Sequence, residues 1–341
     1  MSRVKDFYTI TFNTKGYDGF IDFIKAYAIL CVLFGHTFSP ILDKVAYGVW
    51  AGMQVPLFVL VQSFHSYKKD IATVNLVKIL TRVVLPFVMF ETVTFCLVHY
   101  VGRIDCNKLI YKTLIGGGYG PGSYYPWVYV QVALLLPLFL LLLKRVDKVT
   151  ALVIFLIVCE GTEILFSVVN LPNHIYRLLA ARYILLFYFG WLWVKEGVRI
   201  NWLTIVLSIT SLCFVLFFEY STVDKEPWFI NAGFRFHRWP CYFFVAYGFT
   251  ALLHMLWLKI SRVGFIVRIV KILAAASYEI FLIQMTVIYL FHKTMLAFIT
   301  NGVFRYLVWL FIVWFVSIIG GRILNKMMYH QRENKKCIVN N

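Results

Sequence analysis

The sequence predicts an all-α, polytopic integral membrane helix bundle with about ten transmembrane helices, on two observations. Hydrophobic residues make up 61% of the 341-residue chain and charged residues only 14%, a balance far from that of soluble domains. Ten apolar segments are also long enough, or nearly so, to cross a hydrocarbon core of about 30 Å. They are 20–40, 46–65, 83–101, 126–143, 149–169, 178–194, 200–218, 239–258, 272–292 and 303–324.

The distribution of basic residues predicts the orientation of the bundle. With the N-terminus in the cytoplasm, 20 of the 33 Lys and Arg residues fall in cytoplasmic segments and 9 in external ones. This excess follows the positive-inside rule and places both termini in the cytoplasm, with 1–19 and 325–341 as cytoplasmic segments. The net charge of +17 is therefore topogenic, and no nucleic acid is expected as a partner.

Residues 1–341 are predicted to form a single membrane domain. No Pro/Ser-rich linker, low-complexity tract or convincing internal repeat interrupts the chain. The N-terminal segment is too polar for a cleavable signal peptide, so we expect the first crossing to be retained. The seven cysteines show no metal-ligand spacing, and neither a metal site nor a disulfide framework is expected.

The first apolar segment carries a stripe of ionisable residues. His36 follows Lys25 by eleven residues, and Asp22 precedes Lys25 by three. Eleven helical residues return to nearly the same azimuth about 16 Å further along, so the three side chains share one face. Charge at membrane depth is costly, which makes this stripe a candidate functional site.

Each residue of the stripe has a functional and a structural interpretation. The His36 imidazole can take a proton from a nucleophile, or it can be a packed histidine that bonds a neighbouring helix. The Lys25 ammonium can meet an anionic ligand from the cytoplasm, with Asp22 orienting it, or snorkel to the interface. Arg82 adds positive charge on the same side, where a topogenic role is the alternative.

A second candidate lies in the outer loop 102–125 and the start of the next crossing. The segment GGGYGPGSYYPWVYVQ at 116–131 is dense in Gly, Pro and aromatic residues. Its glycines permit backbone geometries that other residues avoid. Its aromatic side chains predict either an interfacial belt or a platform for sugar stacking.

Other ionisable residues also fall inside apolar segments. Glu160 and Glu163 are three residues apart, so they need counter-charge, water or protonation, and Arg182 is a plausible partner. Such a network can also serve only to hold helices together. Glu91 is a candidate for orienting His36.

Five segments, in order, resemble the membrane-bound acyltransferase 3 family. The first, IDFIKAYAILCVLFGHTF at 21–38, resembles the first-helix signature of that family, in which an acidic residue and a basic residue precede a histidine. The other four are VPLFVLVQSF at 55–64, KILTRVVLPF at 78–87, PWVYVQ at 126–131 and SYEIFLIQ at 277–284. Together with ten crossings, the resemblance spans nearly the whole chain.

The chain departs from the family pattern at four places. Lys25 stands where the family usually has Arg, which replaces a planar bidentate donor by a point charge. Gln62 and Phe64 flank Ser63 where Ser-Gly-Phe is frequent, Gln131 stands where many members have Glu, and Gln284 occupies a common His position. These departures are typical of a divergent branch.

The resemblance implies a membrane O-acetyltransferase of the cell envelope, in the bacterial cytoplasmic membrane. It implies transfer of an acyl group, most often acetyl, from cytoplasmic acyl-CoA to a hydroxyl of a cell-surface or lipid-linked carbohydrate. His36 would be the general base, and Lys25, Asp22 and Arg82 would serve the donor. Acyl-CoA is then a co-substrate, and no permanently bound cofactor is expected. The acceptor or accessory candidates, among them the stabilisers of the oxyanion, are Tyr125, Gln131, Ser63 and Glu91.

Two other functions compete with this one. Intramembrane charges also line transport pathways, so a transporter of a glycan, lipid or small anion is the alternative. The lack of visible repeats and of paired interrupted helices disfavours it. A non-catalytic scaffold in a glycan-assembly complex is the third possibility, and the sequence leaves the oligomeric state open. Turnover of acetyl-CoA by the purified protein separates an enzyme from a transporter.

Overall fold

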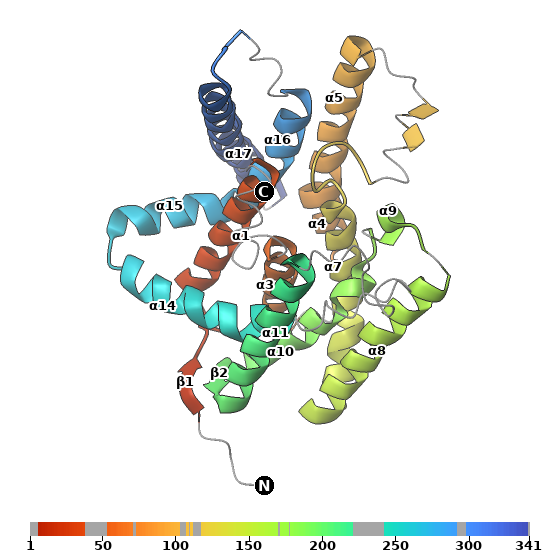
Figure 1. Ribbon diagram of the computed structural model, residues 1–341, viewed down its shortest axis with the longest axis vertical. Helices are drawn as coiled ribbons and strands as arrows, with labels where there is room; N and C mark the ends of the chain where they lie inside the picture. Colours follow the sequence, from red (N-terminus) through yellow and green to blue (C-terminus); the bar gives the residue numbers. More distant parts are fainter. Residues whose placement is uncertain are drawn as a thin grey trace.

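The computed structural model of the protein describes a helical bundle with one small sheet (Figure 1). The described residues are 6–37, 53–70, 73–102, 107–108, 110–111, 117–169, 171–176, 178–220, 242–291 and 298–339. Within them, almost all regular structure is helical, which confirms the all-α prediction at the level of fold class.

The elements follow the predicted apolar segments closely. In chain order they are β1 (Asp6–Ile10), α1 (Gly19–Thr37), α3 (Gln54–Lys68), α4 (Leu76–Ile79), the π-helix η1 (Leu80–Val84), α5 (Leu85–Gly102), α7 (Tyr125–Leu143), α8 (Lys148–Val168), α9 (Asn173–Tyr176), the 3₁₀-helix η2 (Ala180–Tyr183), α10 (Ile184–Glu196), β2 (Val198–Asn201), α11 (Trp202–Tyr220), the π-helix η3 (Phe244–Phe249), α14 (Thr250–Ile260), α15 (Gly264–Ala275), α16 (Ser277–Leu290) and α17 (Gly302–Val339).

Five described helical stretches are long and apolar enough to cross a membrane. They are Gly19–Thr37, Leu76–Tyr100, Tyr125–Leu143, Lys148–Phe166 and Gly302–Met328. The remaining predicted crossings coincide with helices whose described apolar stretches are shorter, among them α3, α10 and α16. The number of ten crossings, the cytoplasmic termini and the single domain therefore stay predictions.

Large apolar side chains cover the outward faces of the peripheral helices. Examples are Val88 and Leu97 on α5, Ile157 on α8, and Phe311 and Phe315 on α17, all of them exposed. Soluble monomers rarely expose apolar surface on this scale. Hydrocarbon is the solvent in which such a surface is stable, because these helices satisfy their backbone groups internally.

The centre of the bundle contains α3 packed against α10 and α1. The closest approach brings Gly190 of α10 against Ser63 of α3, where a Cβ on residue 190 would overlap the Ser63 side chain. The Ser63 hydroxyl is fully buried and donates to the Val59 carbonyl at 2.8 Å. Ser63, predicted as an accessory residue, therefore lies at a tight helix crossing.

The predicted crossing 272–292 is wrong at its start, because a break at Ala276 divides it. Residues 272–275 belong to the amphipathic helix α15, and α16 begins only at Ser277. Small residues at 274–276 allow this sharp change of direction. The Ser277 hydroxyl bonds the Ala274 carbonyl at 3.1 Å and satisfies one of the carbonyls left open at the end of α15.

A two-stranded antiparallel sheet, which the sequence pattern does not predict, joins β1 to β2. β1 pairs with β2 from Asp6 opposite Asn201 to Ile10 opposite Val198, so the predicted crossing 200–218 starts inside a strand. Gly197 precedes β2 at a φ of 73°. A Cβ at that position would overlap the Ile10 carbonyl, so the turn requires glycine.

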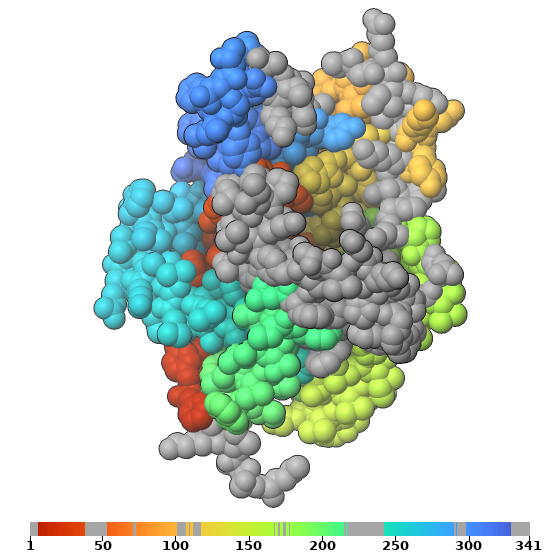
Figure 2. Space-filling view, in the orientation of Figure 1, coloured from red at the N-terminus to blue at the C-terminus, as the bar shows by residue number. Residues whose placement is uncertain are grey.

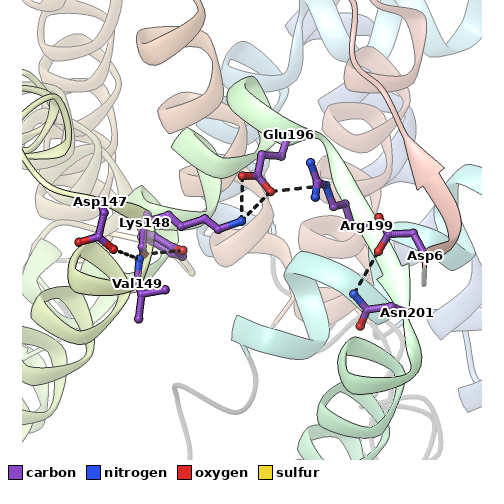
Figure 3. A network of polar contacts seen from close by, with 8 residues as sticks. Asp6, Asp147, Lys148, Val149, Glu196, Arg199 and Asn201 are labelled. Atoms are coloured by element: carbon purple, nitrogen blue, oxygen red, sulfur yellow. Dashed lines mark hydrogen bonds and ion pairs between the residues drawn. The ribbon is translucent and has the colours of Figure 1, made fainter. Parts of the chain in front are cut away.

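Polar contacts fasten the sheet to the neighbouring helices (Figure 3). Glu196 pairs with Lys148 of α8 at 3.1 Å and with Arg199 of β2 at 3.4 Å. Asp147 caps α8, and hydrogen bonds from Thr150 lower the pKa of the Asp147 carboxyl. The N-terminal segment therefore lies at the same end of the bundle as the α7–α8 and α10–α11 connections.

A π-helical turn, η1, carries Arg82. Pro86 has no N–H for the carbonyl four residues earlier, which is that of Arg82, and its ring would crowd that carbonyl in a regular α-helix. Widening the turn relieves this conflict. The result is a local change of helix phase at a predicted site residue.

Candidate active site

The stripe predicted on the first helix lies on one uninterrupted helix, α1. Lys25 Nζ and Asp22 Oδ1 are 2.7 Å apart, and both side chains are largely buried. Tyr17, just before α1, donates a hydrogen bond to Asp22. The pKa of Tyr17 is raised to about 12, first by burial and second by this hydrogen bond. Since α1 is continuous to Thr37, the expected rise of about 16 Å from Lys25 to His36 applies.

The end of α1 that carries His36 is fixed by α17. Tyr306 donates its hydroxyl to the Thr37 carbonyl at 2.6 Å, and the Trp314 indole N–H lies 3.0 Å from Thr37 Oγ1. Phe34 packs edge-on against Trp314, with ring centroids 4.4 Å apart. These contacts give His36, which is half-buried, a defined position.

A cavity of about 520 Å³ opens between α1, α3, α7 and the α4–η1 segment. We call it the basic cavity, because four cationic side chains line it: Lys25, Lys69, Lys78 and Arg82. Two of these, Lys25 and Arg82, are predicted donor-site residues, brought together from elements far apart in the sequence. A volume of this size is typical of small-molecule sites.

The aromatic wall of the basic cavity reaches the neighbourhood of His36. Tyr125 and Phe281 both line the cavity, with ring centroids 5.6 Å apart. An ideal Cβ built on Gly122 would lie 3.0 Å from Phe281 Cε2 and 3.5 Å from His36 Nε2. Gly122 thus lies between the cavity wall and the imidazole, although His36 itself is not a lining residue.

The glycine-rich segment folds into a loop that only glycine permits. Gly117, Gly118, Gly120 and Gly122 all have φ between 84° and 122°. We call residues 117–124 the glycine loop. A Cβ on Gly120 would lie 2.5 Å from the Met285 carbonyl oxygen of α16. Positive φ and close backbone approach together explain why glycines occur here.

Glu91 contacts the glycine loop directly. The Tyr119 N–H donates to Glu91 Oε2 at 2.8 Å, and the carboxylate packs directly on Gly118. Gln284 of α16 adds a weaker bond from its amide to the Pro121 carbonyl at 3.3 Å. Glu91, predicted as a partner of His36, is thus in contact with the loop that lies on His36.

Replacing Glu91 by Leu should destabilise the protein, because the buried Tyr119 N–H loses its acceptor. The expected cost is about 1–3 kcal/mol, the penalty for a buried unsatisfied group. Glu91→Gln keeps an acceptor oxygen in place and should recover most of this loss. Thermal unfolding and limited proteolysis of the two variants measure the difference; equal stability would contradict the positioning role of the carboxylate.

Gln131, another accessory candidate, lies outside the basic cavity. Its amide nitrogen donates to the Leu178 carbonyl at 2.5 Å, and its amide oxygen accepts the Ala180 N–H at 3.1 Å. Both ends of the side chain therefore clamp the start of η2 onto α7. Where the family often has a charged Glu, this neutral amide serves a donor and an acceptor at once.

One member of the acidic pair on α8, Glu163, is linked to Arg182. Glu163 is buried and accepts a hydrogen bond from the Tyr176 hydroxyl. The Arg182 guanidinium lies over the rings of Tyr176 and Tyr183, at 5.2 and 4.7 Å. Tyr176 thus links the carboxylate to the cation, and the cluster joins α8 to η2.

Several lining residues of the basic cavity were not predicted as site residues. They include His65, the last residue of the predicted crossing 46–65, and the lysines Lys69 and Lys78, which lie between crossings, where a topogenic role was the simpler interpretation. Tyr278 also lines the cavity and donates its hydroxyl to the Val83 carbonyl at 2.8 Å, tying α16 to η1. Its position within the SYEIFLIQ motif was the available signal.

Comparison with known proteins agrees with these observations. A family model described as an acyltransferase domain matches residues 18–324, which include α1, the basic cavity and the glycine loop. No curated protein and no solved structure matches the chain. The chain therefore belongs to the acyltransferase 3 family and is a multi-pass membrane acyltransferase, which moves an acyl group from a donor to an acceptor.

Proposed function

We propose that the protein transfers an acyl group, acetyl in the first instance, from cytoplasmic acyl-CoA to a hydroxyl of a cell-surface or lipid-linked carbohydrate. One observation carries the proposal. The basic cavity joins a cluster of cations to an aromatic wall that ends beside Gly122 and His36. Phosphates at one end and a reacting thioester at the other match this polarity.

The donor would enter through the cationic side of the basic cavity. Lys25, Lys69, Lys78 and Arg82 would hold the phosphates, since lysine and arginine are the usual phosphate partners. The pantetheine arm would then extend along α1 toward His36. About 16 Å of helix separates Lys25 from His36, a distance suited to such an arm. The acyl group therefore reaches the far half of the bundle while the nucleotide stays on the cytoplasmic side.

His36 would act as the general base. Its imidazole would take the proton of the acceptor hydroxyl while the hydroxyl oxygen attacks the thioester carbonyl. The carbon–sulfur bond then breaks, the new ester forms, and the departing thiolate of CoA takes the proton. Of the four acceptor or accessory candidates, only Tyr125 lines the basic cavity, so we assign the hydrogen bond to the oxyanion to the Tyr125 hydroxyl.

Mass spectrometry of cell-surface glycans, with and without the protein, tests the proposed reaction. We expect an acetyl-sized mass difference on a carbohydrate, together with turnover of acetyl-CoA by the purified protein in lipid nanodiscs. If the purified protein neither transfers nor hydrolyses acetyl groups while a glycan still crosses the membrane, the transporter alternative is favoured and the proposal fails.

Lys25→Gln and Arg82→Gln should each raise the KM for acetyl-CoA by about tenfold, because each removes a charge-assisted bond to phosphate. The chemical step should change less, since both side chains belong to the cationic side of the basic cavity, where the donor phosphates would bind. Arg145→Gln is the matched control, because Arg145 is exposed after α7 and does not line the basic cavity. A KM equal to that of the control in both site variants would contradict the donor assignment.

A further inference from the structure

Helix α15 has an exposed surface that divides into two halves. Val270, Leu273 and Ala274 are buried against the bundle. On the opposite side, at about 100° per residue, Phe265 and Ile269 lie about 40° apart, while Arg268 and Lys271 lie about 60° apart. Phe265 is 70% and Ile269 39% exposed. An apolar half and a basic half therefore run side by side along the helix.

The charge around α15 is uniformly positive. Lys259, Arg262, Arg268 and Lys271 occur between residues 255 and 278, and that stretch contains no Asp or Glu. Among the ion pairs formed by the described residues, none involves any of these four side chains. The four cations are thus available to external anions, and the Lys271 ammonium lies over the Tyr17 ring, 5.3 Å from its centroid.

The position of α15 places this surface at the end of the bundle predicted to face the cytoplasm. Lys271 lies over Tyr17 of the N-terminal segment, and Asn325, at the start of the C-terminal segment, donates to the Ala275 carbonyl at 2.9 Å. In Figures 1 and 2, residues 250–275 form one lateral margin of the molecule. The preceding helix α14 also exposes apolar side chains, among them Leu252 and Leu256.

We propose that α15 lies in the cytoplasmic surface of the bilayer and docks on the head groups of anionic phospholipids through Arg262, Arg268 and their neighbouring lysines. A helix that exposes aromatic and aliphatic side chains beside uncompensated cations is the type that rests at this interface. The apolar half meets acyl chains, and the basic half meets phosphates. An acidic protein would satisfy the charges but leave Phe265 and Ile269 exposed.

This lipid contact goes beyond the proposed acyl transfer and does not depend on it. Ala275, the last residue of α15, lines the basic cavity, so a docked α15 would hold one wall of that cavity against the membrane surface. Binding of lipid is measured without donor or acceptor. Failure of the docking proposal is therefore distinguishable from failure of the enzymatic one.

Titration of the purified full-length protein with phosphatidylglycerol tests the proposal, with native mass spectrometry counting the retained lipid. The double variant Arg262→Gln/Arg268→Gln should bind phosphatidylglycerol about thirtyfold more weakly, because each basic residue at an anionic surface contributes about fivefold in affinity and the two factors multiply. Phosphatidylcholine and inorganic phosphate should be retained poorly by both proteins.

The double variant Arg145→Gln/Lys195→Gln is the matched control. It removes two exposed cations at the same end of the bundle but away from α15, and should bind phosphatidylglycerol like the parent protein. Equal loss in the two double variants would overturn the proposal, since it would show only a response to net charge. Unchanged binding in the α15 variant, or equal retention of phosphatidylcholine, would overturn it as well.

Discussion

His36→Ala should lower the rate constant of acyl transfer by about 10²–10⁴-fold, the usual contribution of a general base. The KM for acetyl-CoA should stay close to that of the parent protein, because His36 lies beyond the cavity wall rather than among the lining residues. A loss in kcat without a loss of donor affinity is the signature expected of a group that acts in the chemical step.

His254→Ala is the matched control for this experiment. His254 is also a partly buried histidine on an apolar helix. Its Nδ1 lies 2.7 Å from the Tyr8 hydroxyl of β1, the strand that precedes α1, whereas His36 lies at the last turn of α1. The control should retain kcat. Assays in nanodiscs with equal protein content separate turnover from abundance, and parental turnover in His36→Ala would contradict the assignment of the base.

Local patterns in the sequence predicted the helices and the position of Asp22 and Lys25 on one face of α1. Asp22 and Lys25 are one helical turn apart, so their contact follows from helix geometry alone. The same holds for the extent of α7 and α8, whose apolar runs match the helices within one residue or so at most ends. Such features depend on neighbours in the chain, which a single sequence contains.

The same local patterns do not predict pairing between segments that are far apart in the chain. The β1–β2 sheet joins residues nearly two hundred positions apart, and neither strand has the length or alternation that identifies a strand by itself. The predicted crossing 272–292 includes the last four residues of α15, because an amphipathic surface helix and a crossing helix both supply apolar residues. Only the packing of α15 on α1 separates the two.

The candidate site shows the same division. The sequence predicted His36 and Lys25 as site residues from their types and membrane depth, and Arg82 from its charge and the family resemblance; the family match supports the motifs that contain them. The contact of the glycine loop with His36 required tertiary structure, because Gly122 follows His36 by 86 positions in the chain. Ser63 and Gln131 lie in motifs that the sequence also pointed to, but their side chains hydrogen-bond backbone carbonyls of the bundle and do not line the basic cavity.

Gly120→Ala should lower kcat by about a hundredfold, the cost of displacing a positioned group by about 1 Å. Residue 120 has a φ of 85°, and a Cβ there would lie 2.5 Å from the Met285 carbonyl oxygen. Left-handed backbone costs a non-glycine residue about 1–2 kcal/mol, and the overlap with α16 adds to this cost. The loop must therefore move away from α16, which takes Gly122 off His36 and the end of the cavity wall.

Gly161→Ala provides a matched control for that experiment. A Cβ on Gly161, in the middle of α8, meets no heavy atom within 4 Å, so the substitution should stabilise the helix by up to about 1 kcal/mol and leave kcat unchanged. Comparing kcat and the thermal midpoint of both variants in the same nanodiscs isolates the loop geometry from the loss of a glycine. If Gly120→Ala turns over like Gly161→Ala, the glycine loop does not position His36, and its four positive φ angles serve stability alone.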